Sequence, residues 1–231
     1  PSWYEENQFY QMLGKQIESI DTDAKEVLLT SGEKVHYTKL IYALGSECFI
    51  PPIQGSDLPE VAAIRRLSDV EKVEGLMENA SKAVVIGGGV LGLEAAWELK
   101  KAGLDVQVLE AAPVLMGRQL DAGSAEILKE TASERGIQIH TGVTVEAIEG
   151  TDHVSGVRLA DGKVIPAEVV IISAGVRANT SIAQDIGLEI GRAVKVTSRM
   201  ETSAAGIYAC GDCAEYEGVN YAIWPQALEQ G

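Results

Sequence analysis

The sequence predicts an α/β fold organised around one strand–turn–helix–strand unit. An apolar run at 84–86, with the character of a buried strand, enters the turn Gly-Gly-Gly-Val-Leu-Gly at 87–92. A segment of helical periodicity follows and stops at a glycine, and a second strand at 105–109 ends in an acid, Glu110. The apolar stripe of the predicted helix comprises Leu91, Ala95, Leu99 and Ala102. Together with β-meanders elsewhere in the chain, this order is typical of a Rossmann-like three-layer domain.

The three spaced glycines of the turn have separate physical roles in such a unit. Gly87 permits the tight turn, Gly89 lets the backbone approach a pyrophosphate, and Gly92 lets the helix pack closely on the sheet. The helix N-terminus adds N–H groups and a positive dipole that favour phosphates. The residues expected to bind a dinucleotide are Gly87, Gly89, Val90, Leu91, Gly92 and Glu110.

Glu110 indicates which dinucleotide is bound. Its carboxylate can accept hydrogen bonds from the 2′-hydroxyl of an adenine ribose, and its charge would repel a 2′-phosphate. The first basic residue after it is Arg118, so the sequence favours NAD over NADP. The alternative interpretation is a Rossmann-type turn that binds no nucleotide.

The composition argues against several classes of partner. The 231 residues include 19 basic and 34 acidic side chains, for a net charge of −15. Nucleic acids and anionic membranes bind basic faces, so neither is expected as a partner. No apolar run reaches the ~18 residues that span a bilayer, and no signal-peptide pattern opens the chain. Three cysteines do not make a disulfide framework, so we expect a reducing, cytoplasmic location.

Alternation of apolar residues and turn signals predict the remaining elements. Strands are expected at 9–13, 17–21, 27–30, 34–37, 40–44, 137–140, 144–148, 154–159 and 169–172. Two prolines at 51–52 indicate a linker. A capping-box pattern at Ser68 and Glu71 predicts the start of a helix that ends near residue 79, and another helix is expected at 121–135.

Two parts of the chain resemble one another. Residues 28–45 align with 158–175 without a gap, at a constant offset of 130 that places Gly45 on Gly175. Each segment holds a hairpin followed by an apolar strand. If the two are copies of one unit, the first copy should have its own glycine-rich turn upstream of residue 1. We therefore expect the chain to lack most of a first dinucleotide-binding unit.

Four segments resemble, in order, motifs of the pyridine nucleotide–disulfide oxidoreductase superfamily of flavoproteins. Residues 42–46 resemble the motif A-T-G-S, with Leu44 in place of Thr, and 64–67 resemble L-R-T-L. The 87–110 unit is similar to the family's NAD domain, and 202–212 resemble its second flavin motif, T-S-x-x-x-I-Y-A-x-G-D. The chain is most similar to the branch that holds NADH-dependent rubredoxin and ferredoxin reductases and the flavin portion of nitrite reductase large subunits.

The resemblance implies an NADH-dependent FAD oxidoreductase that passes hydride from NADH to FAD and electrons to an acceptor. Candidate acceptors are an electron-carrier protein, a nitrite-reducing centre or O2. The resemblance places Glu94 beside the nicotinamide, as the catalytic residue, and Asp212 on a ribityl hydroxyl of the flavin. It assigns further cofactor contacts to Ala43, Gly45, Arg65, Gly175, Gly211, Trp224 and Pro225.

The same resemblance implies a domain organisation with a partial second FAD-binding domain of the same type. Residues 1–51 would form part of the FAD-binding domain without its N-terminal βαβ unit, and 52–80 a linker and a helix. Residues 81–197 would form the NAD-binding Rossmann domain, and 198–231 would return to the FAD-binding domain.

Two further interpretations remain open. The first is an isolated NAD(H)-binding fragment without turnover, which we expect for these 231 residues alone because the binding site for the ADP half of FAD would be missing. The second is a thiol redox switch at Cys210 and Cys213, which have C-x-x-C spacing. Two thiols cannot complete a tetrahedral metal site, so no metal is expected. The residues leave the electron acceptor and the oligomeric state open.

Overall fold

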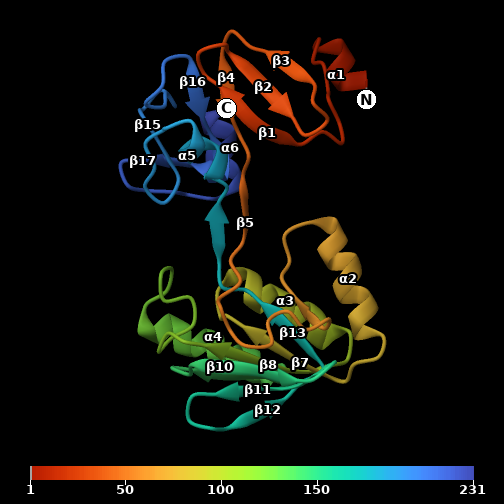
Figure 1. The fold of residues 1–231 in the computed structure, drawn as a ribbon. Helices are drawn as coiled ribbons and strands as arrows, with labels where there is room; N and C mark the ends of the chain where they lie inside the picture. Colours follow the sequence, from red (N-terminus) through yellow and green to blue (C-terminus); the bar gives the residue numbers. More distant parts are fainter. Residues whose placement is uncertain (1) are drawn as a thin grey trace. The chain divides into compact units, whose positions relative to one another are not determined.

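The computed structural model describes residues 2–231, which divide into two compact units. Unit 1 combines residues 2–47 with Arg177–Gly231, and unit 2 is the continuous segment Cys48–Val176 (Figure 1). Residues 52–80, expected as a linker and a helix, belong to unit 2, and 177–197 belong to unit 1 instead of the expected NAD-binding domain.

Unit 2 is built on a five-stranded parallel sheet of order β6-β13-β7-β8-β9. The strands are β6 (Val61–Ala62), β13 (Val169–Ile172), β7 (Lys82–Ile86), β8 (Asp105–Glu110) and β9 (Ile137–Thr141). The central strands are nearly continuous apolar runs, and Val84, Val85, Val106 and Val108 are fully buried. Such runs are typical of a parallel sheet that is covered on both faces.

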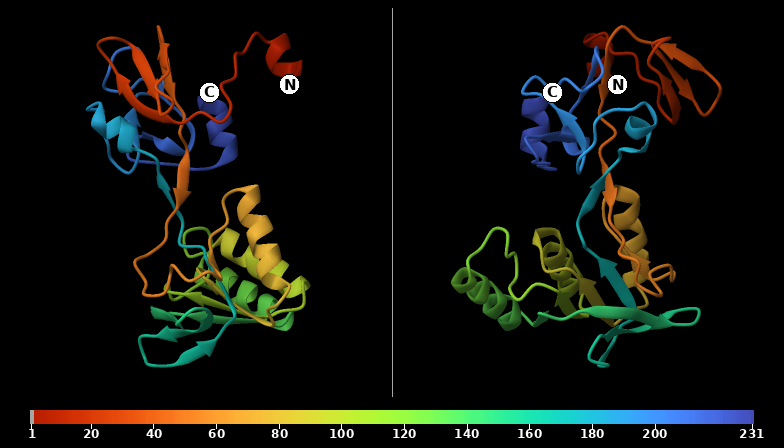
Figure 2. Two further views of the ribbon diagram at one scale, coloured as in Figure 1. Left: turned by 45° about the vertical axis from the view of Figure 1, so that its right-hand side comes forward. Right: turned by 60° about the vertical axis from the view of Figure 1, so that its left-hand side comes forward.

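Three helices cover one face of this sheet: α2 (Leu67–Met77), α3 (Val90–Lys101) and α4 (Ala122–Glu134) (Figures 1 and 2). The predicted core stripe of α3 is wrong in part. Gly92, Ala96 and Leu99 are its buried residues, whereas Leu91 is 63% exposed. Gly92 packs against the Gly87 carbonyl, and the buried face of α3 runs through Gly92, Ala96 and Leu99. No helix within residues 2–231 is both long and apolar enough to cross a membrane.

The start of α2 also differs from the predicted capping box. The helix begins at Leu67, and its N-cap is Arg66. At this end of the helix, the Asp69 carboxylate accepts hydrogen bonds from the backbone N–H groups of Arg65 and Arg66, each at 2.8 Å. These two hydrogen bonds hold the pKa of Asp69 below its usual value. The capping carboxylate is therefore that of Asp69 instead of Glu71, and Ser68 lies inside the helix.

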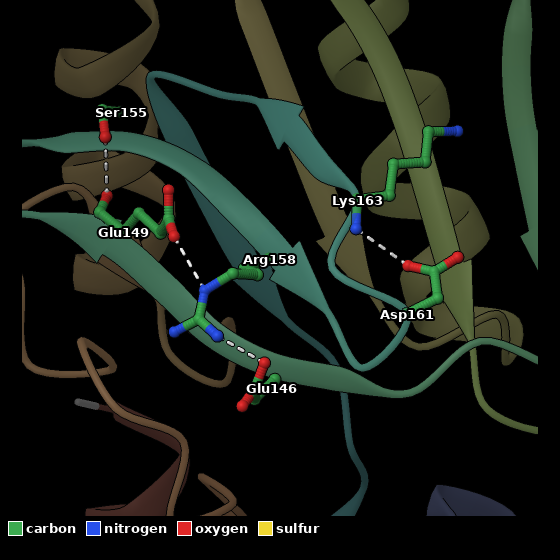
Figure 3. A network of polar contacts seen from close by, with 6 residues as sticks. All are labelled: Glu146, Glu149, Ser155, Arg158, Asp161 and Lys163. Carbon is green, nitrogen blue, oxygen red and sulfur yellow. Dashed lines mark hydrogen bonds and ion pairs between the residues drawn. The ribbon is translucent and has the colours of Figure 1, made fainter.

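An antiparallel meander covers the other face of the sheet. It consists of β10 (Val145–Gly150), β11 (Val154–Leu159) and β12 (Val164–Pro166), and it buries Ile148, Val157 and Ile165 against the sheet. On its polar side, Arg158 forms ion pairs with Glu146 and Glu149 (Figure 3). Helices, parallel sheet and meander form the three layers that the sequence predicts.

The residues after the prolines at 51–52, expected as a linker, pack into unit 2. Ile53 and Leu58 pack against the core beneath the meander, and Val61 pairs with Val170 at the edge of the sheet. Burial of these apolar side chains stabilises the segment against unit 2.

Unit 1 contains a second meander and two short parallel strand pairs around their own core. The meander is β1 (Ile17–Asp21), β2 (Glu26–Leu29) and β3 (Lys34–His36). β4 (Leu40–Tyr42) pairs with β16 (Ile207–Ala209), and β15 (Val194–Val196) pairs with β17 (Ala214–Tyr216). The other elements are α1 (Ser2–Glu6), α5 (Ser181–Asp185), the 3-10 turn η1 (Gly211–Cys213) and α6 (Trp224–Gln230). β5 (Ser46–Cys48) and β14 (Val176–Ala178) lie where the chain passes between the units.

Two predictions for unit 1 are wrong. Residues 9–13 form no strand, because the chain turns after α1 at Gln8, whose φ is 59°. Residues 177–197 join unit 1 because Val194 pairs with Ala214 and Ala183 is buried in the unit 1 core.

The two copies of the internal repeat form the same backbone hydrogen bond at their hairpin turns. Gly32 N–H donates to the Leu29 carbonyl at 2.8 Å, and Gly162 N–H donates to the Leu159 carbonyl at 2.9 Å. Both glycines have left-handed φ angles, of 81° and 87°. The offset of 130 therefore relates the two hairpin turns in conformation as well as in sequence.

Glu168 provides a pH-dependent link between the beginnings of two strands of the sheet. Its carboxylate accepts the Ser81 N–H at 2.6 Å and the Lys82 N–H at 3.1 Å, and these bonds, led by Ser81, lower its pKa. The stability that this link contributes is therefore present above the unfolded-state pKa and is lost as the pH falls through the lower folded-state pKa. We expect Glu168→Gln to lower the melting temperature at pH 7, and the difference from the parent chain to shrink by pH 3. An equal difference at both pH values would contradict this.

Candidate functional site

The glycine-rich turn joins β7 to α3 at the carboxyl edge of the parallel sheet. Gly87 has a φ of 116°, and its N–H donates to the Leu109 carbonyl at 2.8 Å. A Cβ added at Gly87 would overlap the Ser173 carbonyl oxygen, and one added at Gly92 would overlap the Gly87 carbonyl oxygen. These two glycines are therefore required by the close contact between turn, helix and sheet.

Gly89 differs from both of these glycines. It is the N-cap of α3 with an extended backbone (φ −81°, ψ −178°), a conformation that any residue adopts. A Cβ at Gly89 would have no protein atom within 4 Å, so this position faces open space. No side chain caps the helix, and the first N–H groups of α3 are available beside Val90 and Leu91 to an anion.

Glu110 lies at the end of β8, next to the turn. One carboxylate oxygen accepts the Gly88 N–H at 2.6 Å, and the other accepts the Ala112 N–H at 2.7 Å. Each oxygen can accept a further hydrogen bond. The two backbone amides therefore fix the direction of the carboxylate that the sequence assigns to ribose recognition.

A cavity of about 800 Å³ lies within unit 2, on the side of the turn opposite Glu110. At the carboxyl edge of the sheet its walls include Ile64, Arg65, Leu91, Glu94, Ser173 and Gly175. It continues between α2 and α3 past Val73 and Met77, and its walls are mainly apolar. The structure thus brings Arg65, Glu94 and Gly175, which the sequence assigns to cofactor contacts, to one cavity.

The remaining predicted residues lie in unit 1, and those at 43–45 and 211–212 follow the carboxyl ends of β4 and β16. Ala209 pairs with Tyr42, so the segment from Ala43 to Gly45 and the segment from Gly211 to Asp212 leave the two strands side by side. The Ser46 hydroxyl donates to the Asp212 carboxylate at 2.8 Å, and Ser46 itself is buried. The predicted flavin residues on these two segments are therefore neighbours.

Two further contacts shape this group. Gly211 has a φ of 75°, and its N–H donates to the Gln230 side chain at 2.7 Å. Gly45 has a φ of 67°, which favours glycine. Trp224 and Pro225 begin α6 after the N-cap residue Ile223, as predicted, and Trp224 is 76% exposed.

The C-x-x-C pair does not have the environment of reactive thiols. The Cys213 thiol is buried and donates to the carbonyls of Tyr42 and Cys210, each at 3.2 Å. Burial raises the pKa of both Cys210 and Cys213, which disfavours the thiolate. Nothing in this geometry supports the thiol switch.

Sequence reasoning missed four residues that shape the site. Ser46 and Gln230 hold the Gly211–Asp212 turn, and Leu115 and Met116 contact the glycine-rich turn. Ser46 stands within a recognised motif, so its hydroxyl was a readable signal. Leu115, Met116 and Gln230 belong to no periodic pattern in the sequence, and only their contacts in the folded chain identify them.

The pyridine nucleotide-disulphide oxidoreductase family model matches residues 4–231. Nitrite reductase [NAD(P)H] of Bacillus subtilis is 38% identical over 228 residues, which is 99% of this chain and 28% of that protein. The NADH oxidase of Methanocaldococcus jannaschii is 39% identical over 202 residues, which is 86% of this chain and 44% of that protein. This chain therefore spans less than half the length of these relatives.

A crystal structure of NADH:rubredoxin oxidoreductase from Clostridium acetobutylicum has a similar fold. It superposes with a TM-score of 0.82 at 31% sequence identity, and the match covers 99% of this chain and 57% of that chain. The similarity extends over both units.

Proposed function

The chain belongs to the pyridine nucleotide-disulphide oxidoreductase family, and on this premise we propose that the intact protein is an NADH-dependent FAD oxidoreductase. It takes hydride from NADH and passes electrons on to an acceptor. Nitrite-reducing centres, electron-carrier proteins and O2 are the candidate acceptors, in keeping with the names of the relatives. A cytoplasmic location stays a prediction.

The arrangement of unit 2 around β7 supports the binding of NADH. β7 lies between β8 and β13, so a dinucleotide whose pyrophosphate sits at Gly89 extends over both neighbouring strands. Its adenosine half then reaches Glu110 at the end of β8. Its nicotinamide half reaches the cavity beyond β13, where Glu94 would accept a hydrogen bond from the carboxamide. The open space at Gly89 between these two regions is the observation that carries the proposal.

The residues of unit 1 fit a flavin. Asp212, which the Ser46 hydroxyl holds in place, would accept a hydrogen bond from a ribityl hydroxyl. Gly211 would let the backbone approach the ribityl phosphate chain. The N-terminus of α6, at Trp224 and Pro225, would offer amide dipoles to the pyrimidine edge of the ring. Bound FAD supplies the two-electron exchange between nicotinamide and acceptor.

Two measurements test the proposal. NADH added to the purified chain should bind at one site. The intact protein should retain FAD and show bleaching of the flavin absorbance on addition of NADH. A chain that binds no NADH would remove the basis of the proposal.

Glu110→Ala should weaken NADH binding about tenfold, because one or two hydrogen bonds between the charged carboxylate and the ribose are lost. Binding of NADPH should weaken much less, since the repulsion of the 2′-phosphate is lost together with those bonds. Fluorescence titration with both nucleotides measures the change in selectivity. Glu126→Ala, which removes an exposed carboxylate from α4, is the control and should leave both dissociation constants unchanged. Unchanged selectivity in Glu110→Ala would contradict the role of Glu110.

A further inference from the structure

Gly88, which is not one of the three motif glycines, is held from one side by the segment that follows β8. Its N–H donates to Glu110 at 2.6 Å, and its carbonyl accepts the Met116 N–H at 3.3 Å. A Cβ added at Gly88 would lie 2.5 Å from Cδ2 of Leu115. Leu115 therefore occupies part of the space that a side chain at Gly88 would need.

Leu115 is buried in a place that the layers of unit 2 do not account for. It is 1% exposed, among the most buried large side chains of residues 2–231. It nevertheless lies outside the core clusters between the sheet and its covering layers. Its contact with Gly88 makes it part of the support of the glycine-rich turn.

Met116 has a strained backbone that its neighbours stabilise. Its φ is 48°, in the left-handed region that residues other than glycine rarely adopt. The amides of Gln119 and Leu120 both donate to the Met116 carbonyl, at 2.8 and 3.0 Å. This turn fixes the direction of the Met116 N–H toward Gly88. Strained residues of this kind persist where the surrounding structure holds them, often beside functional sites.

These contacts close a ring around Gly88, which we name the Gly88 clamp: Glu110, Ala112, Leu115 and Met116. Glu110 accepts hydrogen bonds from the amides of Gly88 and Ala112. The chain then continues to Leu115, which packs against Gly88, and to Met116, whose N–H donates to the Gly88 carbonyl. The carboxylate that would bind ribose and the turn that would bind pyrophosphate are therefore held by one structure.

We propose that Leu115 and Met116 are positioning residues for the dinucleotide, which they affect through Gly88. They hold the turn so that the space at Gly89 and the amides of α3 keep the orientation that a pyrophosphate requires. This inference rests on the proposed function, since it assumes that NADH binds at this turn. It adds a role for a segment that contributes no motif residue.

The test compares two buried leucines of unit 2. Leu104 is 3% exposed and lies just before β8, at the opposite edge of the sheet from the turn. Leu115→Ala and Leu104→Ala should both lower the melting temperature, because each leaves a cavity. Only Leu115→Ala should weaken NADH binding, by about tenfold, since a small displacement of a binding group is enough for such a loss. Leu115→Met should restore the dissociation constant.

Three outcomes decide the matter. Equal NADH dissociation constants for Leu115→Ala and Leu104→Ala would overturn the inference, while NADH binding by the parent chain would leave the proposed function standing. If the parent chain binds no NADH, the proposed function fails first. Should Leu115→Ala not fold, Leu115→Val and Leu104→Val give the same comparison with smaller cavities. Met116→Val should weaken NADH binding, because a β-branched residue rarely adopts the φ of 48° that Met116 has; unchanged binding would contradict the backbone role of Met116.

Discussion

Gly89→Val is expected to bind NADH about a hundredfold more weakly than the parent chain, with little change in melting temperature. The valine side chain would project into the open space before the turn and keep the pyrophosphate from the first amides of α3. Loss of two hydrogen bonds to a charged group accounts for a change of this size. The fold should tolerate the substitution, because φ and ψ at Gly89 are ordinary extended values.

Titration of NADH fluorescence measures the affinity, and circular dichroism measures the melting temperature. The control is Gly75→Ala, which adds a methyl group to α2 at a site that also has no atom within 4 Å. It should raise stability slightly, by about 0.5–1 kcal/mol, because alanine favours the helix. Its NADH affinity should not change. Unaltered NADH binding in Gly89→Val would place the nucleotide elsewhere.

Gly92→Ala should differ from Gly89→Val, because its main effect should be a large loss of stability. The new methyl group would overlap the Gly87 carbonyl oxygen, which belongs to rigid backbone beside Ser173. Neither the turn nor α3 can move without opening the buried contact of Ala96 and Leu99 with the sheet. We expect the free energy of unfolding to fall by about 3 kcal/mol or more.

Urea unfolding followed by circular dichroism measures this loss. Gly123→Ala is the matched control, because it adds a methyl group to the first turn of α4 at ordinary distance, 3.5 Å, from Asp121. That variant should be as stable as the parent chain or slightly more stable. If Gly92→Ala were as stable as Gly123→Ala, the close packing of α3 on the turn could not be as described.

The sequence predicts the parts of unit 2 that depend on local pattern. Spaced glycines between an apolar strand and a helix, with Glu110 one strand later, identify the turn and the acid beside it. The role of Gly92 in close packing and the role of Gly89 as an open position both follow from residue type and spacing. The meander follows from alternation and from its Asp-Gly turn.

The rest depends on contacts between residues far apart in the sequence. Two prolines suggested a linker, but Ile53 and Leu58, which are partly buried, pack against the core beneath the meander. The link between Ser46 and Asp212 joins residues 166 positions apart. Leu115 lies in an irregular segment, where an apolar residue gives no indication of what it will contact. Local pattern cannot supply such pairings, because they are determined by the packing of the whole unit.

Unit 2 is one uninterrupted stretch of chain, whereas unit 1 is assembled from two stretches on either side of it. During synthesis, β4 leaves the ribosome long before its partner β16, with all of unit 2 between them. Unit 2 can therefore complete its sheet while unit 1 is still half made. The edge of β4 stays unpaired until β16 has been synthesised. The order of translation therefore completes unit 2 before unit 1.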